Sequence, residues 1–293
     1  MARLTVNQYR NAISDLIGSF RWQPTWGDKR GLKGEYFKGR NPGSRNRVLE
    51  RIDPQVVFDF GTTAPHEKLE AHEFSLRWSG SLLVPVTGEF EFVVRTEHAA
   101  RLWINDTRTP LIDAWVKSGY DKEYRGKCFL TAGRMVPVRL EYTKAKQGVD
   151  DSKKNKDKKP AQASSIALLW QLPHRPVEPI PARNLSPNPS PESFTCTAPF
   201  PPDDRSYGWE RGTTVSREWD QATTEAALEA ATYIQDHLQE LAGSDKAEKD
   251  RQEKWLDFCR KFAERAFRRP LSPDHEKLIE RLVRTAKDPE TGI

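Results

Sequence analysis

The sequence predicts an α+β protein in which an all-β module of antiparallel strands, a sandwich or a barrel, lies between a short N-terminal helix and a C-terminal helical region. Period-two apolar runs occupy the middle of the chain, whereas helical periodicity is confined to its two ends. Thirteen Phe, nine Trp and seven Tyr stand against two Met, so we expect a core of rigid aromatic side chains, which suits packed sheets.

Length and composition limit the classes of function. A chain of 293 residues with 36% apolar residues has room for two domains. Its net charge of +5 is small for this length, so we expect no nucleic-acid partner. The three cysteines, Cys128, Cys196 and Cys259, are odd in number and far apart, which favours neither a disulfide framework nor a zinc site.

Targeting signals are not visible in this chain. No apolar run approaches the roughly 20 residues that a membrane-spanning helix needs. Met1 and Ala2 lead directly into a helical pattern, without the basic and then apolar stretch of a signal peptide. We therefore expect neither a signal peptide nor a membrane span here.

Residues 1–20 form the first predicted segment, a short amphipathic helix. Thr5 and Gln8 have the spacing of a capping box at its beginning. Ile13, Leu16 and Ile17 share one face before Gly18, the residue type that commonly ends a helix.

The β module is predicted over residues 31–187. Its apolar residues alternate with polar ones, so each run is expected to be a strand with one buried face. Turn pairs separate the strands, for example Thr87-Gly88 and Ala132-Gly133, as in a sandwich or barrel of antiparallel strands. The clearest runs fall at residues 74–78, 90–94, 102–104, 136–142 and 166–172.

Two polar or proline-rich stretches interrupt or follow the strands. Residues 144–163 are rich in lysine and almost free of apolar side chains, which predicts a mobile hairpin loop. Prolines crowd the chain from Pro173 to Pro202, and such a segment continues neither a central strand nor a helix. We expect residues 188–215 to run extended over the surface as a linker.

The helical region is predicted over residues 216–293. Apolar residues recur at helical spacing in two segments, one ending at Gly243 and one before Pro270. A third helix begins with Ser272 as its cap and Pro273 at the first helical position. Because each apolar face needs a partner, we expect this region to be truncated and the chain to be part of a longer protein.

Several successive segments of the β module follow the order and spacing of a known family, namely residues 31–37, 53–61, 74–80, 88–92, 101–104, 111–115, 132–133 and 166–170. By these segments the module resembles the protective-antigen (PA-fourteen) domain, a carbohydrate-binding family. Outside the module, residues 3–9, 207–213 and 263–271 resemble a planctomycete family of long multidomain proteins that carry a c-type haem segment. The motif Cys-x-x-Cys-His is absent here, so no haem is expected in this chain.

The resemblance implies a ligand site just before the strand that contains Arg101, Leu102 and Trp103. Sugar-binding members carry an Asp-Asp pair there, which holds a calcium ion. In this sequence Glu97 and His98 take those positions, and imidazole is a poor ligand for a hard cation. Calcium is therefore disfavoured, and Glu97 and His98 either hydrogen-bond a sugar directly or, as we favour, form a polar turn.

Further candidates for the ligand site lie nearby in the sequence. An exposed indole of Trp103 or Trp115 would stack on the C–H face of a pyranose, but packing in the core is the commoner role of tryptophan. Asp113 either contacts a ligand or makes a hydrogen bond in a turn or at the end of a strand. Asn105 and Asp106 are residues that suit a turn at least as well as the rim of a ligand site. Together the candidate residues are Glu97, His98, Arg101, Trp103, Asn105, Asp106, Asp113 and Trp115.

From the residues and the resemblance, the favoured function is a non-catalytic glycan-binding module of a larger surface or periplasmic protein. No pair of carboxylates and no nucleophile motif indicates an enzyme in this chain. One alternative is a structural or protein-interaction segment without sugar binding. A second is an accessory part of a haem-linked enzyme that acts on polysaccharide.

Overall fold

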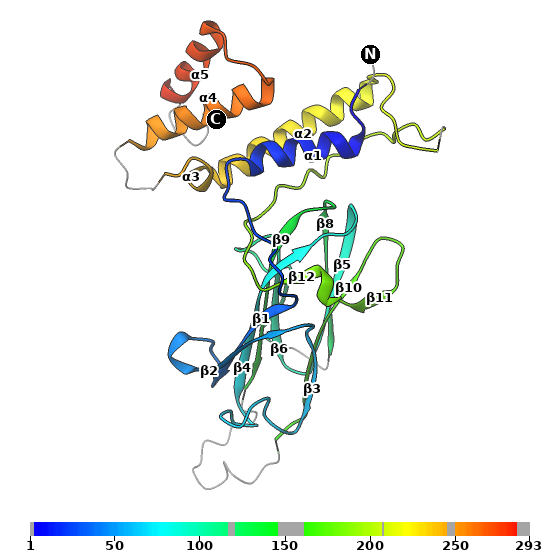
Figure 1. Cartoon of the computed structure of the whole chain (residues 1–293), viewed down its shortest axis with the longest axis vertical. Helices are drawn as coiled ribbons and strands as arrows, with labels where there is room; N and C mark the ends of the chain where they lie inside the picture. The colour runs from blue at the N-terminus through cyan, green and yellow to red at the C-terminus, as the bar shows by residue number, and fades with distance from the viewer. Residues whose placement is uncertain (1–2, 117–120, 146–160, 207, 245–249, 286–293) are drawn as a thin grey trace. The chain divides into compact units, whose positions relative to one another are not determined.

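The computed structural model describes residues 3–116, 121–145, 161–206, 208–244 and 250–285 (Figure 1). The chain divides into two compact units. One, here called the β unit, spans Gln23–Ser193. The other, here called the helical unit, joins Met1–Trp22 to Phe194–Ile293.

Two antiparallel sheets make up the β unit, which confirms the predicted fold class. Within the described residues, the larger sheet, sheet A, has the strand order β2-β1-β4-β9-β6-β7, with β12 also paired to β4. The smaller, sheet B, has the order β11-β10-β5-β8, with β3 also paired to β10. The strands of sheet A are β1 (Leu32–Lys38), β2 (Arg47–Asp53), β4 (Phe74–Leu83), β6 (Ala99–Ile104), β7 (Ile112–Ala114), β9 (Met135–Lys144) and β12 (Leu185–Ser186). Those of sheet B are β3 (Val57–Gly61), β5 (Gly88–Arg95), β8 (Glu123–Leu130), β10 (Ser164–Gln171) and β11 (Val177–Pro179).

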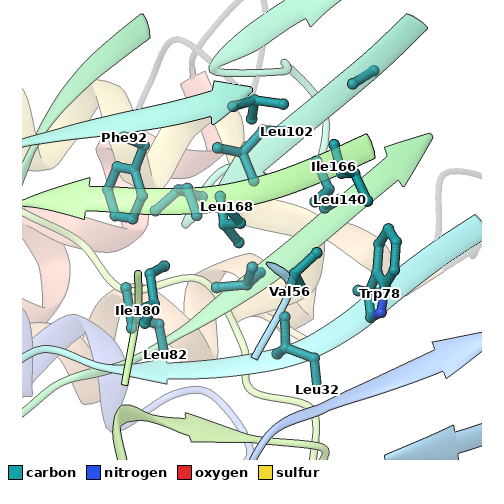
Figure 2. Close-up of a cluster of buried hydrophobic side chains, with 14 of the residues drawn as sticks. Leu32, Val56, Trp78, Leu82, Phe92, Leu102, Leu140, Ile166, Leu168 and Ile180 are labelled. Carbon is teal, nitrogen blue, oxygen red and sulfur yellow. The ribbon is translucent and has the colours of Figure 1, made fainter. Parts of the chain in front are cut away.

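The core of the β unit lies between the two sheets. Alternate residues of the central strands, among them β4, β5, β9 and β10, point into it, as the period-two pattern predicts. Figure 2 shows Leu102 and Leu140 of sheet A with Ile166 and Leu168 of sheet B in one cluster of buried side chains. The two sheets therefore bury their apolar faces against each other, as in a sandwich.

A buried carboxylate, Asp53, joins three strands of sheet A. Its Oδ2 accepts hydrogen bonds from the Tyr36 hydroxyl and the Trp78 indole, both at 2.8 Å. Its Oδ1 accepts from Arg51 Nε at 2.7 Å. Burial, together with the Asp53 carboxylate, raises the pKa of the Tyr36 phenol, which therefore stays protonated and donates.

Gly34 makes this close packing feasible. A Cβ at position 34 would lie 2.3 Å from Asp53 Oδ2, far inside van der Waals contact. Asp53 itself is only 3% exposed, so its carboxylate has no room to move aside. The glycine is required here by the approach of the carboxylate and not by the backbone dihedral angles.

Five helices are described in the helical unit. They are α1 (Val6–Gly18), α2 (Arg217–Asp236), α3 (Leu238–Leu241), α4 (Arg251–Phe267) and α5 (Pro273–Thr285). The capping box of α1 is present, with Thr5 and Gln8 each bonded to the other's backbone N–H. Ile17 of α1 packs with Ile234 of α2 and Trp255 of α4. Among the described residues, no helix has both the length and the apolar character needed to cross a bilayer.

The prediction that residues 188–215 form a surface linker is wrong for its central part. Phe194, Cys196 and Ala198 are buried in the core of the helical unit. The Ser14 hydroxyl of α1 donates to the Phe194 carbonyl at 2.8 Å, and Glu229 of α2 accepts from Thr197. The prolines correctly predicted that the backbone around Phe194 and Ala198 is neither a helix nor a strand. An extended backbone can nevertheless bury its side chains, as it does here beside α1 and α2.

The predicted loop at residues 144–163 begins one residue too early. Lys144 is the last residue of β9 and is buried. Its Nζ donates to the Gln162 carbonyl at 2.5 Å and lies 5.7 Å from the centre of the Phe74 ring. Burial lowers the pKa of Lys144. Most of the predicted loop, residues 146–160, lies outside the described residues.

We predict that replacing Asp53 by alanine lowers the free energy of unfolding by about 3–5 kcal/mol, because Tyr36 and Trp78 keep buried donors without an acceptor. Urea unfolding of the full chain, followed by circular dichroism, measures this loss. Asp59→Ala is the matched control, since exposed Asp59 accepts only from the nearby Gly61 N–H, and it should cost about 1 kcal/mol or less. Equal losses in the two variants would contradict the role given to Asp53.

Candidate functional site

A small cavity of about 150 Å³ lies in the β unit at the beginning of β6. Strand pairing brings its walls together from distant parts of the sequence. Ala99 of β6 pairs with Thr143 of β9, and Ala100 pairs with Ala114 of β7, directly before Trp115. The lining residues are Arg40, Glu97, His98, Ala99, Trp115, Thr143 and Ala145.

Glu97 lies in the connection between β5 and β6 and is held by its neighbours. Its Oε2 accepts from both the backbone N–H and the hydroxyl of Ser165, at 3.1 and 2.7 Å. Lys122 Nζ lies 3.7 Å from the other oxygen, Oε1. Burial works to raise the pKa of Glu97, but these hydrogen bonds and the lysine outweigh it and lower the pKa below the ordinary value. Glu97 is thus a fixed, ionised carboxylate.

His98 is buried beneath the cavity, with 4% of its surface exposed. Its Nε2 lies 3.0 Å from the carbonyl oxygen of Ala163, which only accepts, so Nε2 carries the proton. The ring also lies edge-on to Tyr142, 6.0 Å between centroids. These contacts anchor the turn between β5 and β6 to the beginning of β10 and leave His98 little surface for a ligand.

Arg101, Asp113 and Trp115 form a connected group beside the cavity. Arg101 Nε donates to Asp113 Oδ1 at 2.9 Å, and the Trp115 N–H donates to the same oxygen at 3.1 Å. The Arg101 guanidinium lies 4.9 Å from the centre of the Trp115 ring, as in a cation–π contact. The hydrogen bond from Arg101 lowers the pKa of Asp113. This group holds a half-buried indole at the wall of the cavity.

Asn105 and Asp106 lie at the opposite end of β6, roughly 20 Å away, since a strand rises about 3.3 Å per residue. Asn105 has a left-handed backbone (φ 61°), and its side-chain amide both donates to and accepts from Ser193 at 2.8 Å. Asp106 Oδ1 accepts from the N–H groups of Arg108 and Thr109. Both are turn residues here, which is the role that suited them at least as well from the sequence, and they do not line the cavity.

Trp103 is not available as a stacking surface. It lies on the opposite side of β6 from the core residues Leu102 and Ile104, yet only 7% of it is exposed. The Arg139 guanidinium covers its ring at 3.8 Å from the centroid. Its indole nitrogen is buried, with no hydrogen-bond partner in the described part of the chain.

Comparison with known protein families shows to which family the β unit belongs. The model of the PA14 domain, the protective-antigen domain, matches residues 28–174. The chain belongs to the PA14 domain family. The matched range includes the whole cavity as well as both sheets except β11 and β12.

A curated relative of this PA14 protein is the anti-sigma-I factor RsgI3 of Acetivibrio thermocellus. The two chains are 28% identical over 158 residues, which cover 54% of this chain and 22% of the relative. The chain thus spans about a fifth of the length of that relative.

Solved structures similar to the PA14 chain include an anti-sigma factor domain-containing protein from Clostridium clariflavum, at 25% identity and a TM-score of 0.44. That alignment covers 58% of this chain and 51% of the other. A PA14 sugar-binding domain from an RTX adhesin is 14% identical with a TM-score of 0.39, covering 54% and 99% of the two chains. The family assignment rests on the match over residues 28–174.

The resemblance to sugar-binding PA14 domains implies calcium held by two carboxylates, but the residues of this cavity do not fit that ion. Among the described residues, Glu97 is the single carboxylate in the lining, and it already accepts two hydrogen bonds from Ser165. His98 donates through Nε2 to a carbonyl. Calcium needs six to eight oxygen ligands. Across the described residues, no cluster of three or more His, Cys, Asp or Glu side chains is placed to hold a metal.

Two lining residues escaped prediction from the sequence. Arg40 lies in the segment between β1 and β2, and Thr143 lies near the end of β9. The Thr143 hydroxyl donates to the Arg40 carbonyl at 2.9 Å, which ties the two segments together. Neither belongs to a recognisable local motif, because their proximity comes from the pairing of β1, β4, β9 and β6.

We predict that Ser165→Ala raises the pKa of Glu97 toward the ordinary value of 4.5, because the two hydrogen bonds that Ser165 donates to the carboxylate become one. A titration of the Glu97 carboxyl carbon by NMR measures the shift. Since the folded-state pKa is lowered, the stabilisation is present above the unfolded pKa and is lost as pH falls through the folded value. Ser44→Ala, at an exposed site, serves as the control. A Glu97 midpoint that stays unchanged in Ser165→Ala would contradict the assignment.

Proposed function

We propose that the chain is a non-catalytic glycan-binding module of a larger surface or periplasmic protein, and that the cavity at the beginning of β6 holds the sugar. The observation that carries the proposal is the position of this cavity. It lies in a PA14 domain, beside Glu97 and His98, where the family resemblance implies the sugar site.

Trp115 supplies the apolar surface that a sugar needs. A pyranose presents a face of C–H groups, and an aromatic ring is a flat apolar partner for it. The Arg101 guanidinium and the Asp113 carboxylate fix the Trp115 ring and backbone before a ligand arrives. Binding to a ring that is already fixed loses less conformational entropy than binding to a mobile one.

The polar groups of the cavity suit recognition better than catalysis. Glycoside hydrolysis commonly uses two carboxylates that flank the bond to be broken. The described lining has one, Glu97, and its lowered pKa makes it a poor general acid. Its oxygens and the Arg40 side chain are groups of the kind that accept from and donate to sugar hydroxyls.

We do not propose for this chain the anti-sigma activity that the name of the curated relative states. RsgI3 is an anti-sigma-I factor, but the match covers 22% of that protein. The proposed glycan binding therefore concerns the matched β unit and not the activity of that relative.

A second candidate function, a protein-interaction segment, is favoured by one observation in the helical unit. An apolar groove of about 450 Å³ lies among α1, α2, α4 and α5. Leu282 of α5 lines it and remains about half exposed. A groove of this kind suits the apolar face of a further helix. Its residues include Ile13, Leu16, Ala230, Ile234, Phe262, Ile279 and Leu282.

We predict that Trp115→Ala lowers the affinity for a bound glycan at least about tenfold, which corresponds to about 1.4 kcal/mol, because the stacking surface is lost. Ligands are first found by applying the full chain to a glycan array, and affinities are then measured by calorimetry. Trp209→Ala is the matched control, since Trp209 is 66% exposed and belongs to the helical unit.

Two results would count against the proposal. The first is an array on which the folded chain binds no glycan, with or without added calcium. The second is a loss of affinity that is as large in Trp209→Ala as in Trp115→Ala, because the cavity would then not be the site.

A further inference from the structure

Arg40 differs from three paired arginines of sheet A. Arg47 pairs with Glu35 and Glu50, Arg77 pairs with Glu141, and Arg101 pairs with Asp113. Within the described residues the Arg40 guanidinium has no hydrogen bond or ion pair, and Arg40 is an exposed residue that lines the cavity. Its N–H donors and its positive charge are therefore available to a ligand.

The negative charge in the cavity wall is already balanced. Glu97 accepts from the N–H and hydroxyl of Ser165, and Lys122 lies 3.7 Å from its second oxygen. Asp113, beside the cavity, pairs with Arg101. With both carboxylates paired, the charge left without a counterion among the described residues of the cavity is the guanidinium of Arg40. This electrostatic arrangement favours an anionic ligand over a neutral one.

The size of the cavity limits what enters it. Sites for drug-sized ligands have volumes of roughly 300–1,000 Å³. The cavity here has about 150 Å³, so it suits one sugar residue and not a long stretch of polysaccharide. An indole wall at Trp115 and a cation at Arg40 together match a ring with an apolar face and an acidic substituent.

We propose that this cavity binds a single anionic sugar residue, a uronate or a sulfate ester, with Arg40 as the charged partner in place of a calcium ion. The inference rests on the glycan-binding function proposed above and adds the charge of the ligand. Arg40 donates two hydrogen bonds to the carboxylate or sulfate, which is the arrangement that guanidinium groups favour. Trp115 packs against the ring, and Glu97 stays bonded to Ser165.

The test compares sugars that differ only at the exocyclic carbon. Oligosaccharides of the gluco and galacto series end in a residue with a hydroxymethyl, carboxylate or sulfated hydroxymethyl group. Calorimetry with the full chain measures each affinity at low and high sodium chloride, with and without EGTA. We expect at least one acidic sugar to bind about tenfold more tightly than its neutral counterpart. Its affinity should fall with added salt and stay unchanged with EGTA.

The variants separate the charge of Arg40 from its other effects. Arg40→Gln should lower the affinity for the acidic sugar about tenfold and the affinity for the neutral one much less, while Arg40→Lys keeps part of the preference. Arg45→Gln, an exposed arginine in the same connection between β1 and β2, is the control and should change neither. Circular dichroism checks that each variant is folded.

Each contrary outcome has a distinct meaning. Equal affinity for acidic and neutral sugars, loss of binding in EGTA, or an unchanged preference in Arg40→Gln would overturn the inference and leave glycan binding in place. The absence of binding to every sugar of the set and of a broad array would overturn the proposed function itself.

Discussion

The β unit depends on one buried charge, the carboxylate of Asp53. Placing an ion in the interior is costly, and the cost is offset only where donors surround it. Tyr36, Trp78 and Arg51 supply those donors from β1, β4 and β2. Arg51 lies on the same strand as Asp53, so the bonds from Tyr36 and Trp78 are the ones that tie β2 to β1 and β4 and help to hold the register of β2-β1-β4. Strand β4 pairs with β9 and β9 with β6, so the same register carries through to the cavity.

The cavity illustrates how a sheet brings distant residues together. A strand that pairs on both sides fixes which neighbours meet at its end, and β6 does so with β7 and β9. Trp115 and Thr143 thereby reach Glu97 and His98. Trp115 was a candidate from the sequence, whereas no local motif indicates Thr143. The result is a cavity with an aromatic wall, a balanced carboxylate and, within the described residues, an unpaired guanidinium at Arg40. In our proposal this guanidinium supplies the positive charge for recognition of a sugar.

Much of the fold follows from the sequence, because alternation and helix caps are local signals. The strands around Trp78 and Leu168 and the caps at Thr5 and Ser272 were predictable for this reason. The predictions that were wrong concern features that depend on tertiary packing. Proline content says that residues near Phe194 are extended, but not that two helices enclose them. The high lysine content of residues 144–163 predicted that Lys144 belongs to a loop. Its Nζ donates to the Gln162 carbonyl, which allows Lys144 to be buried at the end of β9. For the site, proximity in sequence grouped Glu97 with Asn105, although β6 separates them.

One measurement tests the central claim most directly. The chain has nine tryptophans, and each indole N–H gives its own signal in an NMR spectrum of the ¹⁵N-labelled protein. Titration with a glycan that binds should shift the Trp115 indole signal, together with backbone signals of Ala99 and Thr143, and leave Trp78 and Trp209 unchanged. A glycan that binds while the Trp115 signal stays in place, or that shifts only indoles outside the cavity, would contradict the account.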